Sequence, residues 1–169
     1  VGIESRDERP ARMPDTLLRT TRLTLRPHRL EDVTFMVRLN ADPECVHYTG
    51  DVAFDDPSLA LAVVAALQAQ YAERHMGRLV VIEQETGEPV GWCGLKWHPD
   101  DGEADLGYRF LRSRWGRGYA TEASRACIQY GFEDLDLPCL IARVVPANVA
   151  SVRVLEKLGF VRIGPTDCE

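Results

Sequence analysis

Residues 104–132 constrain the fold of this chain more than any other stretch. Apolar and polar side chains alternate over residues 104–111, which is the pattern of a strand with one buried face. Gly116 and Gly118 follow two residues apart, and from Tyr119 the apolar residues recur with the period of a helix. The stretch therefore predicts a strand, a tight glycine turn and a helix in direct succession.

A glycine turn that opens a helix has a chemical consequence. The first N–H groups of a helix have no acceptor within it, and the helix dipole places partial positive charge at the same end. Such a turn can bind an anion, most plausibly a diphosphate. The alternatives are an ordinary tight turn and a solvated basic surface. Arginines gather around the turn within nine positions, namely Arg109, Arg112, Arg114 and Arg117.

Length and composition bound the class of protein. The chain has 169 residues, of which 45% are apolar and 27% charged, as in a globular domain with a full core. The net charge of −6 argues against a nucleic-acid surface as the main partner. The longest apolar run, residues 59–67, is too short to cross a membrane. We therefore expect neither nucleic acid nor membrane among the partners.

The cysteines favour a reducing compartment. Their number is odd and no Cys-x-x-Cys pair occurs, so they support neither a disulfide framework nor a zinc site. Several lie inside apolar runs, where a free thiol packs as a small hydrophobic side chain. The five cysteines are Cys45, Cys93, Cys127, Cys139 and Cys168. We expect a cytoplasmic protein without a bound metal.

The pattern of the whole chain predicts one α+β domain over residues 14–169. Residues 1–12 are charged and lack the apolar core of a secretory signal, and residues 1–13 are expected to be a disordered extension or a remnant of cloning. The predicted strands occupy residues 22–27 as an edge strand, 78–84, 89–97, 104–111, 138–145 and 160–163. The predicted helices occupy residues 30–40, 59–76, 119–132 and the stretch from Asn148 to Gly159. Asp56-Pro57 offers a capping side chain and a proline at the first helical position for the second of them.

Two motifs at a fixed separation resemble the GNAT acetyltransferase superfamily. The first joins Gly107-Tyr108 to the run Trp115-Gly-Arg-Gly-Tyr-Ala-Thr-Glu-Ala123. The second is Asn148-x-x-Ser151-x-x-Val154-Leu155-Glu156-Lys157-Leu158-Gly159-Phe160. More narrowly, the chain is similar to the branch that contains ribosomal-protein N-terminal acetyltransferases. The resemblance extends from about Leu23 to Ile163.

The resemblance implies a fold and a cofactor. The expected sheet is mixed, mostly antiparallel and six- to seven-stranded, is flanked by about four helices, and has a V-shaped split between its fourth and fifth strands. Acetyl-coenzyme A (acetyl-CoA) would lie in this split, with its diphosphate on the glycine turn. Trp115 stands where many members carry Arg or Gln, which leaves the phosphates to backbone groups and Arg117. The implied cofactor-binding residues are Phe110, Leu111, Arg112, Trp115, Gly116, Arg117, Gly118, Tyr119, Ala120, Thr121, Asn148 and Ser151.

The resemblance also implies a reaction in which an amine attacks the thioester directly within a ternary complex. A backbone N–H of Phe110 or Leu111 would polarise the thioester carbonyl. Ser151 matches the residue that protonates the leaving thiolate, and Asn148 matches the residue that holds the pantetheine arm. Helix capping explains Asn148 and Ser151 equally well.

The acceptor ammonium must lose a proton before it attacks, and Asp105 is the first choice as the base. Asp105 corresponds to an acidic position two residues before the Gly-Tyr pair in this branch. The alternatives for Asp105 are an exposed strand carboxylate and an ion-pair partner of Arg109. Glu103 and His98 are weaker candidates for the base.

The expected function is therefore acetyl transfer from acetyl-CoA to a primary amine, either a protein N-terminus or a small molecule. The alternative is a non-catalytic acyl-CoA sensor or partner-binding module, whereas an ATP or GTP site lacks the Gly-Lys-Ser/Thr ending. The second helix and residues 45–56 normally shape acceptor choice in this family, and Tyr48, Trp92 and Trp97 could line that pocket. After residues 160–163, either the chain is cut short or a second copy completes the sheet edge in a homodimer.

Overall fold

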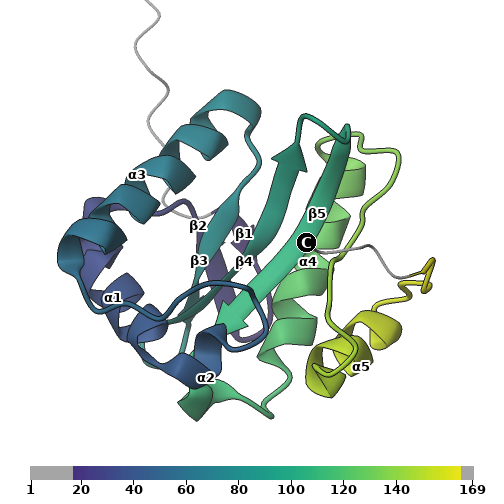
Figure 1. Ribbon diagram of the computed structural model, residues 1–169. Helices are drawn as coiled ribbons and strands as arrows, with labels where there is room; N and C mark the ends of the chain where they lie inside the picture. Colours follow the sequence, from purple (N-terminus) through teal and green to yellow (C-terminus); the bar gives the residue numbers. More distant parts are fainter. Residues whose placement is uncertain (1–16, 165–169) are drawn as a thin grey trace, which may run out of the picture.

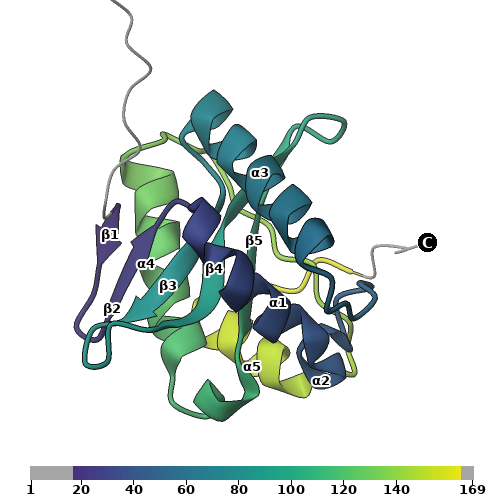
Figure 2. The ribbon, with the colours of Figure 1, turned by 90° about the vertical axis from the view of Figure 1, so that its left-hand side faces the viewer.

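The computed structural model describes residues 17–164, in which a five-stranded sheet lies between two layers of helices (Figures 1 and 2). Each strand is antiparallel to its neighbours, and the order across the sheet follows the sequence. The strands are β1 (Leu18–Arg19), β2 (Leu23–Arg26), β3 (Arg78–Glu83), β4 (Pro89–His98) and β5 (Glu103–Phe110). The prediction that residues 22–27 form an edge strand is wrong, because β1 pairs with β2 on its outer side.

Five α-helices form, one more than the four expected. They are α1 (Val33–Ala41), α2 (Pro43–Val46), α3 (Pro57–Arg74), α4 (Tyr119–Glu133) and α5 (Val149–Lys157), with 3-10 helices η1 (Leu30–Asp32) and η2 (Arg112–Arg114). The predicted start of α3 is confirmed, since the Asp56 carboxylate accepts the N–H of Ser58 at 2.8 Å and Pro57 is the first helical residue. A second Asp-Pro pair, Asp42-Pro43, begins the short α2 in the same way.

The helices divide between the two faces of the sheet (Figure 2). The helices α1 and α3 cover one face, and the buried side chains there include Phe35, Leu39, Val64 and Val80. The helices α4 and α5 cover the other face, with Leu23, Leu106, Phe110, Ala123 and Leu155 in the core. The alternation of β5 is confirmed, because its even-numbered residues pack under α4 and α5 while Leu111 joins the α1 and α3 side.

Two predicted strands do not form within the described residues. Residues 138–145 run beside β5 but pair with it at a single parallel bridge, between Asp105 and Ile141. The N–H of Leu106 donates to the Ile141 carbonyl at 2.8 Å, and the N–H of Ile141 donates to the Ala104 carbonyl at 3.0 Å. One bridge is too little for a strand, so the sheet has five strands rather than six or seven.

Residues 160–163 have no strand partner among the described residues, and Val161 and Ile163 are largely exposed there. The chain therefore continues past α5 as coil rather than as the predicted last strand.

The predicted extension over residues 1–13 and Cys168 lie outside the described residues. Within residues 17–164, no helix is long and apolar enough to cross a membrane.

Candidate functional site

The glycine turn joins η2 to α4, as the sequence predicts. Gly116 and Gly118 have φ angles of 71° and 77°, a left-handed conformation that side chains with a Cβ disfavour. Gly118 is the N-cap residue of α4 and provides no capping side chain. The N–H groups of Tyr119, Ala120 and Thr121 lie in the first helical turn and have no acceptor within the helix. The turn therefore presents a row of backbone donors to an anion.

The end of β5 resolves which backbone group is available for a ligand. The N–H of Leu111 donates to the Val90 carbonyl at 2.9 Å, so it belongs to the sheet. Donors alternate along an antiparallel strand, so the N–H of Phe110 points to the other side, where residues 138–145 run. Of the two predicted donors to a thioester carbonyl, only Phe110 faces away from β4.

Trp115 takes part in the same strand end. Its indole N–H donates to the Phe110 carbonyl at 2.9 Å, and the ring is 49% exposed. The tryptophan thus anchors the turn to β5. It also occupies the Phe110 carbonyl, which is one of the backbone acceptors expected to bind pantetheine. Arg112, another of the predicted cofactor-binding residues, forms an ion pair with Asp42 at 3.1 Å.

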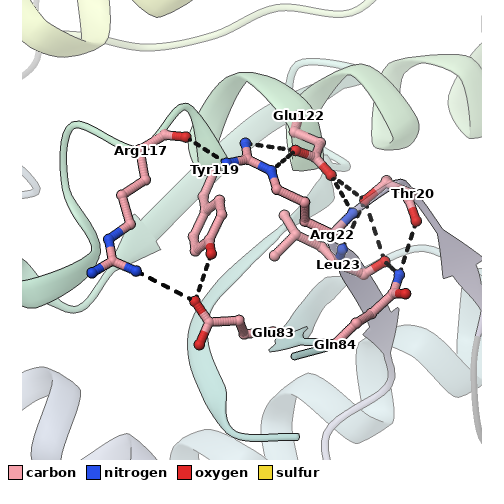
Figure 3. Close-up of polar contacts among 8 residues, drawn as sticks. All are labelled: Thr20, Arg22, Leu23, Glu83, Gln84, Arg117, Tyr119 and Glu122. Carbon is pink, nitrogen blue, oxygen red and sulfur yellow. Dashed lines mark hydrogen bonds and ion pairs between the residues drawn. The ribbon is translucent and has the colours of Figure 1, made fainter. Parts of the chain in front are cut away.

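Arg22 and Glu122 connect the turn to the residues before β2 (Figure 3). Arg22 Nη1 donates to the carbonyl of Arg117 at 2.9 Å, and Arg22 Nε donates to Glu122 Oε2 at 2.7 Å. The Thr20 hydroxyl also donates to Glu122 at 2.7 Å, and the Arg22 guanidinium lies 4.6 Å from the centre of the Tyr119 ring. Residues about 100 positions apart in sequence therefore meet at the turn.

Glu83, at the end of β3, is a buried carboxylate that faces the same turn (Figure 3). It accepts the hydroxyls of Tyr119 and Thr86 and lies 3.2 Å from Arg114 and 3.7 Å from Arg117. The Tyr119 hydrogen bond is the main cause that lowers the pKa of Glu83, and it raises the pKa of Tyr119. We call the following set the turn network: Arg22, Glu83, Arg117, Tyr119 and Glu122.

Asn148 and Ser151 lie at the start of α5, where capping accounts for one of their contacts. The Asn148 side-chain oxygen accepts the N–H of Ser151 at 3.2 Å, so Asn148 is the N-cap residue of the helix. The Ser151 carbonyl accepts the hydroxyl of Tyr108 at 3.4 Å, which links α5 to β5. The Ser151 hydroxyl itself is not needed for the cap, because the cap uses the backbone N–H.

Asp105 matches neither alternative that the sequence left open. It is 8% exposed, and its carboxylate pairs with Arg78 rather than Arg109, at 2.9 and 3.1 Å from Nη2. His98 Nε2 lies 3.0 Å from Asp105 Oδ1. A Cβ on Gly107 would come within 2.6 Å of the Arg78 guanidinium, so the glycine makes room for Arg78 to cross the sheet and reach Asp105.

Arg109 is buried on the same face and reaches a different segment. It donates to the side chains of Asn40, Thr49 and Asp51, and forms an ion pair with Asp51. Thr49 and Asp51 belong to residues 45–56, the segment expected to influence acceptor choice. Arg109 therefore ties that segment directly to β5.

Trp92 lies between these two charged groups. The guanidinium carbons of Arg78 and Arg109 are each 5.4 Å from its ring centre. Trp97 lies five positions after Trp92 on β4, so its side chain points to the opposite face of the sheet and packs in the core there. Trp92 and Trp97 therefore cannot line one pocket. We call the following set the sheet-face network: Asp51, Arg78, Trp92, His98, Asp105 and Arg109.

An open groove of about 550 Å³ lies beside η2. Its lining includes only two of the predicted cofactor-binding residues, Leu111 and Arg112, and otherwise consists of Arg38, Asp42, Glu88, Ser113 and Arg114. Within residues 17–164, no three or more His, Cys, Asp or Glu side chains gather in a way that could hold a metal ion.

Sequence reasoning missed Arg22, Glu83 and Arg78. Glu83 and Arg78 lie on β3 and Arg22 lies in the bend before β2, each far from its partner in sequence, and a charged residue at such a position carries no local signal of the contact. Glu122 offered the only hint, since a carboxylate in the first turn of a helix opposes an anion site unless another group neutralises it.

The comparisons with known proteins identify the family of the chain. The family model of the acetyltransferase (GNAT) domain matches residues 22–161. An uncharacterized N-acetyltransferase, p20 of Bacillus licheniformis, is 36% identical over 148 residues, which are 87% of this chain and 83% of that protein. The crystal structure of an acetyltransferase from Agrobacterium tumefaciens is similar with a TM-score of 0.76 and 34% identity, over 89% of this chain and 87% of that one.

A more distant structure shares the fold alone. The microcin C7 self-immunity acetyltransferase MccE, solved in complex with acetyl-CoA and AMP, has a TM-score of 0.73 at 16% identity, over 86% of this chain and 82% of that one. The family model and the relatives show an acetyltransferase, and the chain belongs to the GNAT family. Its relatives favour an enzyme over the sensor considered from the sequence.

Proposed function

We propose that this protein transfers the acetyl group of acetyl-CoA to a primary amine by direct attack in a ternary complex. The observation that carries the proposal is the turn at the end of β5, where Gly116 and Gly118 open α4 without a capping side chain. Backbone donors without helical acceptors fit a diphosphate, and the MccE complex makes acetyl-CoA the natural candidate.

The donor half of the site would use mainly backbone groups. The N–H groups from Gly116 to Thr121 would bind the diphosphate, with Arg117 beside them. The pantetheine arm would lie in a V-shaped split between β5 and residues 138–145, beyond the bridge at Asp105. The N–H of Phe110 would then donate to the thioester carbonyl, because it faces that side of the strand.

Acetyl-CoA supplies an activated acetyl group, whose carbonyl carbon forms a bond to the amine nitrogen as its bond to sulfur breaks. Asp105 would accept the proton that the ammonium loses, through a water molecule, and His98 beside it would pass that proton to solvent. The hydroxyl of Ser151 would donate a proton to the departing thiolate and would take up the proton that the attacking nitrogen loses as the amide forms. Asn148 would hold the start of α5, and thus Ser151, in place.

The acceptor would be a protein N-terminus or a small-molecule amine. The two motifs favour the ribosomal-protein branch, and the link from Arg109 to residues 45–56 favours an acceptor site on the α1 and α3 side of the sheet. We also propose a cytoplasmic location, supported by Cys45, Cys93, Cys127 and Cys139, which are free thiols. A homodimer that covers the sheet edge is compatible with this proposal.

Two measurements test the proposal in sequence. Calorimetric titration with acetyl-CoA tests the donor half, and the absence of binding would overturn it. A screen of peptide N-termini, amino acids, polyamines and aminoglycosides, read out as free thiol, tests the acceptor half. Thiol release above the hydrolysis rate with one amine class supports the proposal, whereas binding without release for any amine would favour an acyl-CoA sensor.

A further inference from the structure

We propose that Arg22 and Glu122 are positioning residues that orient the backbone of the glycine turn for the coenzyme diphosphate. Arg22 bonds both to the Arg117 carbonyl and to Glu122 (Figure 3), which would fix the peptide between Arg117 and Gly118 with its N–H toward the ligand. The inference rests on the proposed function, because the diphosphate site is part of that function. It assigns a role to two residues that lie outside the turn itself.

The orientation follows from the planarity of the peptide bond. The carbonyl of Arg117 accepts Arg22 Nη1 at 2.9 Å, and the N–H of the same peptide belongs to Gly118 and points the opposite way. The next carbonyl, of Gly118, accepts the N–H of Glu122 at 3.0 Å. Both carbonyls that flank Gly118 are therefore bound on the protein side, which leaves the N–H groups of Gly118 and Tyr119 for an anion.

Arg22 can act as a clamp because it is held at several points. Glu122 accepts both the backbone N–H of Arg22 at 2.9 Å and its Nε at 2.7 Å, and the Thr20 hydroxyl at 2.7 Å fixes the carboxylate in turn. The guanidinium also stacks on the Tyr119 ring at 4.6 Å. Only a planar fork of donors can bond a carboxylate and a carbonyl in this way, so lysine is not an equivalent residue.

The charge balance explains why the clamp does not repel the ligand. A carboxylate at the first turn of α4 would oppose a diphosphate, but Glu122 is 2.7 Å from the Arg22 guanidinium and is mostly buried. The pair presents no net charge to the site, and its effect on the ligand passes through the backbone. If Arg22 and Glu122 served only to join α4 to the residues before β2, the bond from Arg22 to the Arg117 carbonyl would not be needed.

The experiment compares acetyl-CoA with a ligand that keeps the pantetheine thioester and lacks the diphosphate together with its adenosine nucleotide. Acetyl-CoA and S-acetylpantetheine are titrated by amide NMR into the wild type, Arg22→Lys, Arg22→Gln and Glu122→Gln. We expect each variant to bind acetyl-CoA about tenfold more weakly or worse, with S-acetylpantetheine unchanged within about twofold. The matched control is Arg19→Gln, which removes the same charge from β1, where Arg19 donates to the side chain of Gln84 at 3.4 Å.

Each outcome decides a separate point. If the wild type does not bind acetyl-CoA, the proposed function fails and this inference falls with it. If the wild type binds and the Arg22 variants bind acetyl-CoA equally well, or lose both ligands to the same degree, the inference alone is wrong. If Arg22→Gln does not fold, the same titrations are made with Arg22→Lys, which keeps the positive charge. In that variant the amide resonance of Gly118 in the free protein must differ from that of the wild type.

Discussion

The turn network and the sheet-face network lie on opposite sides of the sheet and differ in what they hold in place. In the turn network, side chains such as Arg22 bond to backbone carbonyls, and the backbone N–H groups are left for a ligand. In the sheet-face network, Arg78 also donates to the backbone carbonyls of Gly94 and Asp105, but the ionisable side chains of Asp105, Arg78 and His98 bond to one another on one face of the sheet. The first arrangement offers a backbone surface and the second offers side-chain charges.

This difference suggests a division of labour. A cofactor that is the same for every member of a family can be held by backbone groups, whose geometry is insensitive to most substitutions. An acceptor that differs between members must be recognised by side chains, and Asp51 and His98 are the partly exposed parts of the sheet-face network. Changes in one network should therefore leave the function of the other intact.

The largest effect is expected for Asp105→Asn. The amide keeps the shape but cannot accept the proton of the ammonium, so kcat should fall about 1000-fold while acetyl-CoA binding is unchanged. Thiol release and calorimetry measure the two quantities separately. Glu103→Gln is the matched control, since Glu103 is an exposed carboxylate two positions away. Retention of activity in Asp105→Asn would remove the sheet-face network from the chemistry.

Ser151→Ala should separate catalysis from helix capping. We expect kcat to fall about 100-fold, because the thiolate loses its proton donor. Thermal stability should change little, since the cap uses the backbone N–H of residue 151. The opposite result is expected for Asn148→Ala, which loses the cap and about 1 kcal/mol of stability. An unchanged kcat in Ser151→Ala would contradict a catalytic role for the hydroxyl.

Gly107→Ala should damage only the sheet-face network. The new Cβ would meet the Arg78 guanidinium at 2.6 Å and displace it from Asp105. The free energy of unfolding should fall by about 1–3 kcal/mol in equilibrium denaturation. Acetyl-CoA binding should persist at the wild-type affinity. A loss of cofactor binding in the folded variant would show that the two networks are coupled.

Glu122→Gln should change the pH dependence of stability by a smaller amount. Burial raises the pKa of Glu122, but hydrogen bonds from Thr20 and Arg22 outweigh it and leave the pKa below the ordinary 4.5. The ionised carboxylate thus stabilises the fold fully above pH 4.5, and this stability is lost as the pH falls through the folded-state pKa. Denaturation at several pH values should show that the free energy of unfolding of the variant is about 1 kcal/mol lower at pH 7. The acid limb of the plot of this free energy against pH should be flatter than in the wild type. An acid limb identical to that of the wild type would contradict this role.

The parts of the fold that the sequence predicted are local. Asp56-Pro57 begins α3, and Gly116 and Gly118 form the turn before α4, because caps and turns depend on a few adjacent residues. The strand at residues 138–145 was wrong, because its apolar composition reflects packing against α4 and β5 and not a full ladder. A run of apolar residues does not distinguish these two environments.

The candidate site divides in the same way. The turn from Trp115 to Thr121 is contiguous and could be recognised, whereas the partners that hold it come from the bend before β2 and from β3. One alternative from the sequence paired Asp105 with Arg109, four positions away on the same face of β5, whereas the partner is Arg78 from β3. Such pairings depend on strand order and register, which no single segment of sequence specifies.

The crystal structure of the protein with acetyl-CoA tests the central claim most directly. The account predicts that diphosphate oxygens lie about 3 Å from the N–H groups between Gly116 and Thr121, with the thioester carbonyl at the N–H of Phe110. Arg22 should still bond to the carbonyl of Arg117. A diphosphate bound elsewhere, for example in the groove lined by Arg38 and Arg114, would contradict the account.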